Sequence, residues 1–197
     1  MSRAIGLGAA LLLLASHAIA APADWDIDNR KDSFTDLETC HAQLAQTFAP
    51  DSPLMIRAVR YAFFIERRGT SVRVGFENVG PLPSFPGVVQ LRVDDRPVVN
   101  IVAADTPTDL GRANSGPDLR TIPAEQRPMA ESIMRGSLQA GSRYRALEGK
   151  RATALLGDML HGRTTKWRVL GITDAYDASD EIPPIAYALA GCGITLP

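Results

Sequence analysis

Apolar and polar side chains alternate through two stretches of the chain, residues 61–78 and 87–102. A period of two is typical of half-buried β-strands. Gly69 divides the first stretch, because glycine adopts turn conformations that other residues resist. In the second stretch, residues 94–97 form the turn, and Pro97 suits the turn exit because it cannot donate a ladder hydrogen bond. We therefore predict two antiparallel hairpins.

Shorter runs of the same alternation predict four more strands. They lie at residues 24–28, 40–45, 142–147 and 164–172. Residues 151–162 fit a short strand or a helical turn, and the pattern does not decide between them. The tail, residues 177–192, is expected to begin with an acidic turn and to end in a short apolar segment, a candidate for a second short helix.

Residues 124–141 have helical spacing. Met129, Ile133 and Met134 fall on one face, and Gly141 is a natural stop. A methionine stripe could mark a soft-metal or partner site, but core packing is far commoner, so we expect this face to be buried. The order of elements predicts a mainly β (α+β) fold: an antiparallel sheet or β-sandwich with one or two short helices at one side.

The N-terminus has the pattern of a secretory signal. A positive charge precedes an apolar run at residues 5–15, and small residues, Ala18 and Ala20, stand where signal peptidase requires them. The run is shorter than the roughly 20 apolar residues of a membrane span. We predict that residues 1–20 are cleaved and that no integral membrane segment remains. Residues 21–197 then form one β-rich domain, in the periplasm or secreted.

The chain has two cysteines, Cys40 and Cys192. In an oxidising compartment paired cysteines normally become disulfides. This one would close a loop of about 150 residues, for which the chain-entropy model assigns roughly 5 kcal/mol. The alternative is a catalytic Cys40 with a histidine base. Neighbouring residues on a strand point to opposite faces, which disfavours His41, and the sequence does not place His161 near Cys40. We favour the disulfide.

The numbers of charged side chains bear on which partners the protein could bind. The predicted mature chain has 20 basic and 22 acidic side chains, which argues against broad nucleic-acid binding. Nearly all the basic residues are arginines, whose guanidinium groups form bidentate hydrogen bonds with carboxylates and phosphates. Four of them are expected to point outward from strands: Arg67, Arg68, Arg73 and Arg92. They either form an anion-contact face for envelope polymer or lipid phosphate, or solvate an exposed sheet; we favour the second interpretation.

Metal, cofactor and catalytic motifs give no positive prediction. The aspartates of residues 24–32 have part of the spacing of a calcium loop. Asn29 and Thr35 stand where that loop needs Gly and Glu, so we favour a strand. Two mature histidines are too few for an ordinary structural zinc site. Carboxylates gathered by the fold, as in glycoside hydrolysis, stay an open alternative.

Several features resemble the invasion-associated locus B-like periplasmic proteins. Trp25 lies in a first strand and Cys40 on the next. The stretch "FPGVVQLRVDD" looks like that family's glycine-led strand ending in Asp, and "MAESIMRGSLQAGSRYRAL" resembles its helix, glycine and following strand. The resemblance covers about half of the mature chain. It implies a β-rich periplasmic protein of envelope or host-interaction type, with no catalytic residues to carry over.

We therefore expect a soluble periplasmic or secreted binding protein of the cell envelope, without evident catalysis, whose ligand is an envelope component or a protein. The alternative is a small envelope hydrolase. Residues 105–123, long and poor in apolar side chains, are a candidate binding lid or a plain surface excursion. A face of arginines beside this segment would favour binding. Clustered carboxylates in a pocket, or Cys40 close to His161, would favour an enzyme.

Overall fold

A computed structural model describes residues 25–48, 60–82, 84–85, 87–110, 122–171 and 175–197. Of residues 46–48 and 175–180 it describes the backbone only. The predicted signal peptide lies outside these ranges and stays a prediction. Residues 111–121 of the candidate lid also lie outside them.

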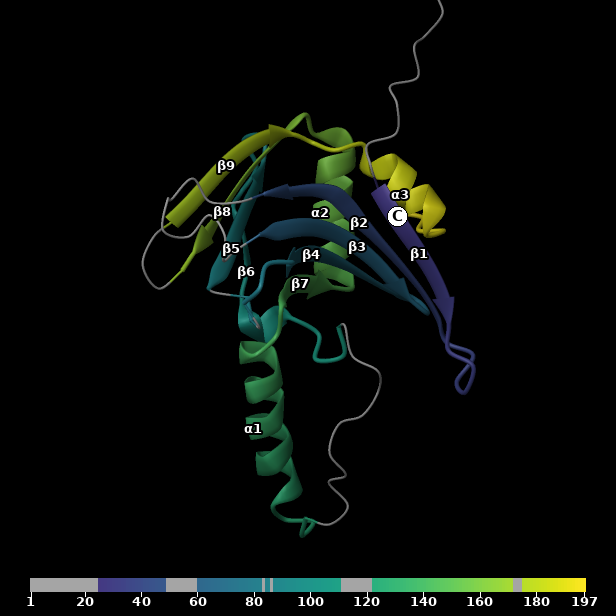
Figure 1. The fold of residues 1–197 in the computed structure, drawn as a ribbon, viewed down its shortest axis with the longest axis vertical. Coiled ribbons are helices and arrows are strands. Elements are labelled where there is room, and N and C mark those ends of the chain that lie inside the picture. Colours follow the sequence, from purple (N-terminus) through teal and green to yellow (C-terminus); the bar gives the residue numbers. More distant parts are fainter. Residues whose placement is uncertain (1–24, 49–59, 83, 86, 111–121, 172–174) are drawn as a thin grey trace, which may run out of the picture.

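Two antiparallel sheets and short helices make up the fold (Figure 1). The first sheet has the order β1-β2-β3-β4-β7: β1 (Trp25–Lys31), β2 (Glu38–Phe48), β3 (Tyr61–Arg68), β4 (Ser71–Asn78) and β7 (Tyr144–Glu148). The second has the order β6-β5-β8-β9: β5 (Val88–Val93), β6 (Val99–Ile101), β8 (Thr164–Leu170) and β9 (Ala175–Glu181). The helices are a 3-10 turn, η1 (Ala103–Asp105), and α1 (Arg127–Ala140), α2 (Lys150–His161) and α3 (Ile185–Gly191). The predicted mainly β, antiparallel fold is confirmed.

Both predicted hairpins are present. β3 pairs with β4 as far as Arg68 and Ser71, and Gly69 takes φ 57° in the turn between them. β5 pairs with β6 across the predicted turn. The local sequence was enough to predict these hairpins, because the turn residues and the alternation of apolar and polar side chains specify the same strand pairing.

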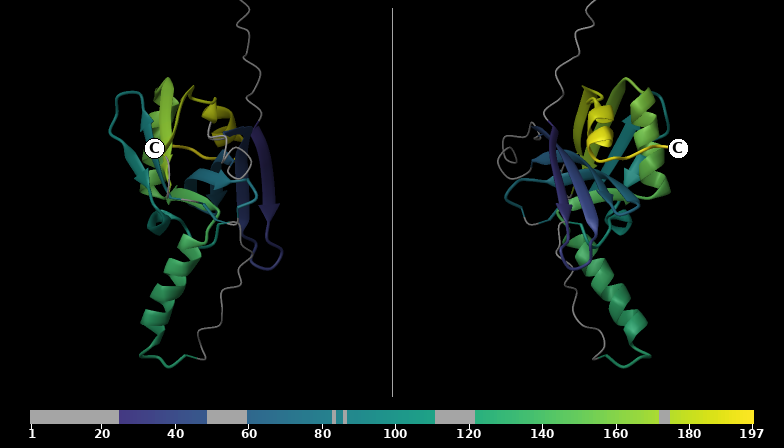
Figure 2. Two further views of the ribbon diagram at one scale, coloured as in Figure 1. Left: turned by 60° about the vertical axis from the view of Figure 1, so that its left-hand side comes forward. Right: turned by 90° about the vertical axis from the view of Figure 1, so that its right-hand side faces the viewer.

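One hydrophobic core joins the two sheets. The rings of Phe76 on β4 and Trp167 on β8 stack with centroids 4.9 Å apart, and Tyr61 meets Trp167 edge-on. α2 and α3 close the core from one side (Figure 2). Their buried side chains are Ala152, Leu155, Leu156, Met159, Ile185, Ala188 and Leu189. The ambiguous segment at residues 151–162 is therefore a helix that packs on the core.

The disulfide is confirmed. Cys40 on β2 bonds Cys192 just after α3, with Cα atoms 5.3 Å apart and a sequence separation of 152 residues. Both cysteines are buried. The bond fixes the C-terminal helix against the first sheet, and the catalytic-thiol alternative is wrong for this state of the protein.

The acidic tail differs from the prediction. Residues expected as a turn belong to β9, which pairs with β8 from Thr164↔Glu181 to Leu170↔Ala175. The strand has no alternating apolar pattern to reveal it. Its backbone hydrogen bonds to β8 form the strand, and that partner is fixed only when the sheet assembles.

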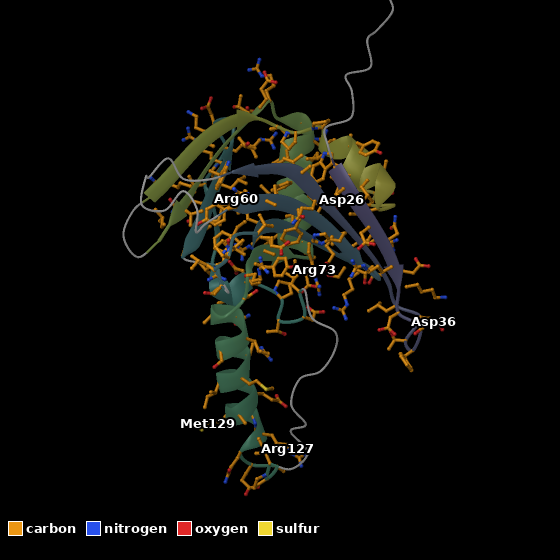
Figure 3. The ribbon with its side chains drawn as sticks, in the orientation of Figure 1. Asp26, Asp36, Arg60, Arg73, Arg127 and Met129 are labelled. Atoms are coloured by element: carbon orange, nitrogen blue, oxygen red, sulfur yellow. A yellow bond between two sulfur atoms is a disulfide. The ribbon has the colours of Figure 1, made fainter. Side chains whose placement is uncertain are left out.

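The expected burial of α1 is also wrong. Met129 is 71% exposed and Ile133 is 61% exposed, and no residue of α1 is buried. The helix projects from the body of the fold, with Met129 and Arg127 toward its far end (Figure 3). The physical reason is competition: α2 and α3 fill the space beside the sheets. α1 is tied down near its C-terminus, where the Gln139 amide donates to the carbonyls of Ala104 and Thr106 at 3.0 and 3.1 Å.

Candidate functional site

The four arginines predicted as one face are separated by the fold. Arg67 lies on the core side of β3, opposite Cys40, and its Nε donates to the Cys192 carbonyl at 2.6 Å. Arg68 and Arg73 lie on the outer face of the same sheet. Arg92 is on β5, in the other sheet. The single anion-contact face is therefore wrong, because adjacent strand residues alternate between faces and Arg92 belongs to a different layer.

The outer face of the first sheet carries a row of polar side chains that crosses all five strands. The register aligns one residue from each strand, in the order Asp28, His41, Glu66, Arg73 and Glu148. Directly opposed side chains in antiparallel pairs have Cβ atoms about 4.5–5.5 Å apart. Acidic positions thus alternate with a histidine and an arginine across the sheet.

Arg73 is the centre of this row. Only 5% of its side chain is exposed, and it binds three carboxylates: Glu66, Asp109 and Glu148, each at 2.9 Å. Burial lowers the pKa of Arg73, but hydrogen bonds to Asp109 and Glu148 outweigh it and hold the pKa above its ordinary value. A guanidinium with this many charge-assisted bonds is a rigid anchor.

The start of the candidate lid is fixed to this row. Asp109 binds Arg73 and also Arg68, the latter at 2.8 Å. Leu110 is buried against Phe64. The ring of His41 stacks on Phe64 with centroids 5.1 Å apart, and its Nδ1 lies 3.4 Å from a Glu66 oxygen. Residues 106–110 are therefore clamped to the sheet, while residues 111–121 lie outside the described ranges.

Carboxylates do gather here, as the hydrolase alternative requires. Each of the three around Arg73 is in an ion pair with it, so their charges serve first to hold the sheet and residues 106–110 together. Nearby, the pKa of Tyr144 is raised, mainly because the phenol is buried and also because the Glu77 carboxylate lies beside it. Among the described residues, no group of three or more His, Cys, Asp and Glu side chains is placed to hold a metal ion.

The residues with part of the spacing of a calcium loop form strand β1 and the turn that follows it. Asp26 and Asp28 lie on β1, and Asp28 pairs with Arg30. Asp32 accepts from the backbone N–H groups of Phe34 and Thr35, which lowers its pKa. Asp28 and Asp32 therefore already have local partners, on β1 and in the turn that follows it.

Comparisons with family models, curated proteins and solved structures found no match. Candidate functions therefore come from the chain's own surfaces. In the part of the chain that the structure describes, no helix is long and apolar enough to cross a membrane. His161 is exposed at the end of α2, where its Nδ1 lies 2.8 Å from the Gly157 carbonyl.

A second charged surface lies on the outer face of the second sheet. Arg92 on β5 is directly opposite Lys166 on β8, and Arg168 is two residues further along β8. Arg168 donates from Nε to the Gln90 side chain at 2.6 Å, and Gln90 donates to Asn100 at 2.7 Å. The candidate set drawn from the sequence did not include Lys166 and Arg168, because only the strand register shows that they lie beside Arg92.

Proposed function

We propose that this chain is an exported binding protein of the cell envelope that acts by surface recognition. The observation that carries the proposal is α1, a helix that projects from a disulfide-tied body with Met129 and Ile133 exposed. These side chains are four residues apart and share one helix face. Apolar anchors at such spacing are the usual means by which a helix enters a partner's groove.

Export is supported by two further features. The N-terminal pattern is that of a cleaved signal, and the buried Cys40–Cys192 bond suits an oxidising compartment. A relationship to the invasion-associated locus B-like proteins is proposed on the same footing. It is supported by Trp25 in the first strand and Cys40 in the next.

A photo-crosslinking amino acid at position 133, in the protein expressed by its own cells, tests the proposal. We expect a discrete adduct that disappears in Met129→Glu. Phe34, which is 97% exposed in the β1–β2 turn, provides the matched control position, because it is an exposed apolar side chain away from α1. Equal adducts from both positions, or none from position 133, would contradict a binding role for α1.

The hydrolase alternative is favoured by the carboxylates around Arg73. Asp109 and Glu148, with 37% and 40% of their side chains exposed, are the carboxylates of this set that reach solvent, and Asp109 is the one that lies in residues 106–110. Hydrolysis of an envelope glycan by the purified protein, lost in Asp109→Asn without loss of thermal stability, would replace the binding proposal with an enzymatic one.

A further inference from the structure

We propose that the outer face of the second sheet is a docking surface for an anionic lipid bilayer, with a headgroup phosphate bound between Arg92 and Lys166. This surface is on β5 and β8, away from α1. It is therefore independent of the proposed role of α1, and each can fail without the other.

The pairing of β5 with β8 places two cations side by side. Arg92 and Lys166 are direct cross-strand partners, and the alternation that buries Leu91, Val93 and Trp167 turns both of their side chains outward. Like charges at directly opposed positions destabilise a sheet. Among the described side chains, neither cation has a carboxylate in an ion pair with it. An anion between them would remove the repulsion, and a phosphate accepts bonds from guanidinium and ammonium groups together.

Along β8 the basic character extends to one further position. Arg168 adds a third cation on β8, and its hydrogen bond to Gln90 holds the guanidinium on this face. On the far side of β8, the backbone register sets Ser179 opposite Lys166 and Asp177 opposite Arg168. Arg92 and Lys166 are therefore the centre of the surface, and Arg168 is a flanking contributor.

Apolar side chains favour a bilayer over a dissolved polyanion. Leu170, 36% exposed, lies two residues beyond Arg168 on the same face of β8, and Val98, 50% exposed, directly precedes β6. Peripheral binding combines attraction to anionic headgroups with partial burial of apolar groups at the interface. A soluble polyanion would use the cations and would gain little from Leu170 or Val98.

The test is co-sedimentation of the disulfide-bonded protein with phosphatidylglycerol-containing vesicles, with phosphatidylcholine vesicles as the neutral reference. We expect binding to the anionic vesicles at low salt and its loss near 1 M salt, where the Debye length is about 3 Å. Each basic residue near an anionic leaflet strengthens membrane binding by about fivefold. The variant Arg92→Glu/Lys166→Glu should therefore bind about 25-fold more weakly, or worse. Leu170→Ser should weaken binding without changing its salt dependence.

A charge-matched control separates the site from net charge. Arg30→Glu/Lys31→Glu makes the same change in total charge on the exposed β1 end, and it should bind vesicles nearly as well as the unaltered protein. Met129→Glu/Ile133→Glu, on α1, should also leave vesicle binding intact. If the glutamate variant of the surface fails to fold, Arg92→Gln/Lys166→Gln makes the same comparison, with an expected loss of about 25-fold.

Three outcomes would overturn the proposal. The first is the absence of binding to anionic vesicles by the unaltered protein. The second is equal loss in the site variant and the charge-matched control. The third is binding of soluble polyphosphate, dependent on Arg92 and Lys166, without binding of vesicles; this would assign the surface to a dissolved polyanion instead.

Discussion

Glu66 and Arg73 form a buried ion pair across β3 and β4, with Nη1 and Oε1 2.9 Å apart. The pair lies on the face of the sheet that points away from the main core. It stays buried because residues 106–110 lie over it, held by Asp109 and Leu110. The sheet and this segment therefore stabilise each other through one guanidinium.

Replacement of Arg73 by Met is expected to destabilise the fold by about 3–5 kcal/mol, because it leaves Glu66 buried without its partner. Urea unfolding followed by tryptophan fluorescence measures the change. The double variant Glu66→Gln/Arg73→Met should recover part of the loss, since it removes the orphaned charge. Arg30→Met, at an exposed ion pair with Asp28, is the control and should leave the free energy of unfolding nearly unchanged. A similar small effect at Arg73 would mean that the pair is screened by solvent.

Replacement of both cysteines by serine should lower the free energy of unfolding by roughly 5 kcal/mol, because the bond closes a loop of 152 residues. Intact mass after alkylation provides the chemical check. Both thiols should label after reduction in denaturant, and neither should label before. Labelling of Cys40 in the untreated protein would return the catalytic-thiol alternative to consideration.

Asp94 should give the protein an acid-sensitive link between β5 and β8. The Thr164 backbone N–H and hydroxyl both donate to its carboxylate at 2.9 Å, and these bonds lower the pKa of Asp94 below its ordinary 3.8. A folded-state pKa below the unfolded value means that the contribution is complete above pH 3.8 and is lost as pH falls through the folded-state value.

Thermal unfolding midpoints measured on the acid side test this link. Asp94→Asn should lower the midpoint near neutral pH and flatten its fall below about pH 4. Asp95→Asn is the control, because Asp95 is the exposed neighbour and its carboxylate has no hydrogen bond to the described residues. Identical acid profiles for Asp94→Asn and the unaltered protein would contradict the assignment.

The exposed face of α1 predicts tolerance to polar substitution. Met129→Glu/Ile133→Glu should change the free energy of unfolding by less than about 0.5 kcal/mol. Leu155→Ala on α2, at a buried position, should cost about 2–5 kcal/mol. Urea unfolding of the two variants side by side measures the contrast. A loss at α1 as large as that at α2 would show that α1 packs against the body in solution.

The sequence by itself determined the local elements whose patterns are strong. The hairpins at residues 61–78 and 87–102 follow from a period of two interrupted by turn residues, and both are confirmed. The disulfide followed from counting, since two cysteines allow one intramolecular pairing. These properties depend on residues that specify their own conformation or have no alternative partner.

The tertiary structure decided which helices pack on the core, which segments pair as strands and which charged side chains meet. Helical spacing was clear for α1 and ambiguous for α2, but α2 and α3 fill the core, so α1 remains exposed. β9 is a strand because β8 offers it hydrogen bonds, although its own sequence indicates a turn. The candidate arginines carry one kind of charge, yet Arg73 became a buried anchor and Arg92 joined Lys166. Strand register and sheet membership decide what a side chain faces, and both are set by the assembled sheets.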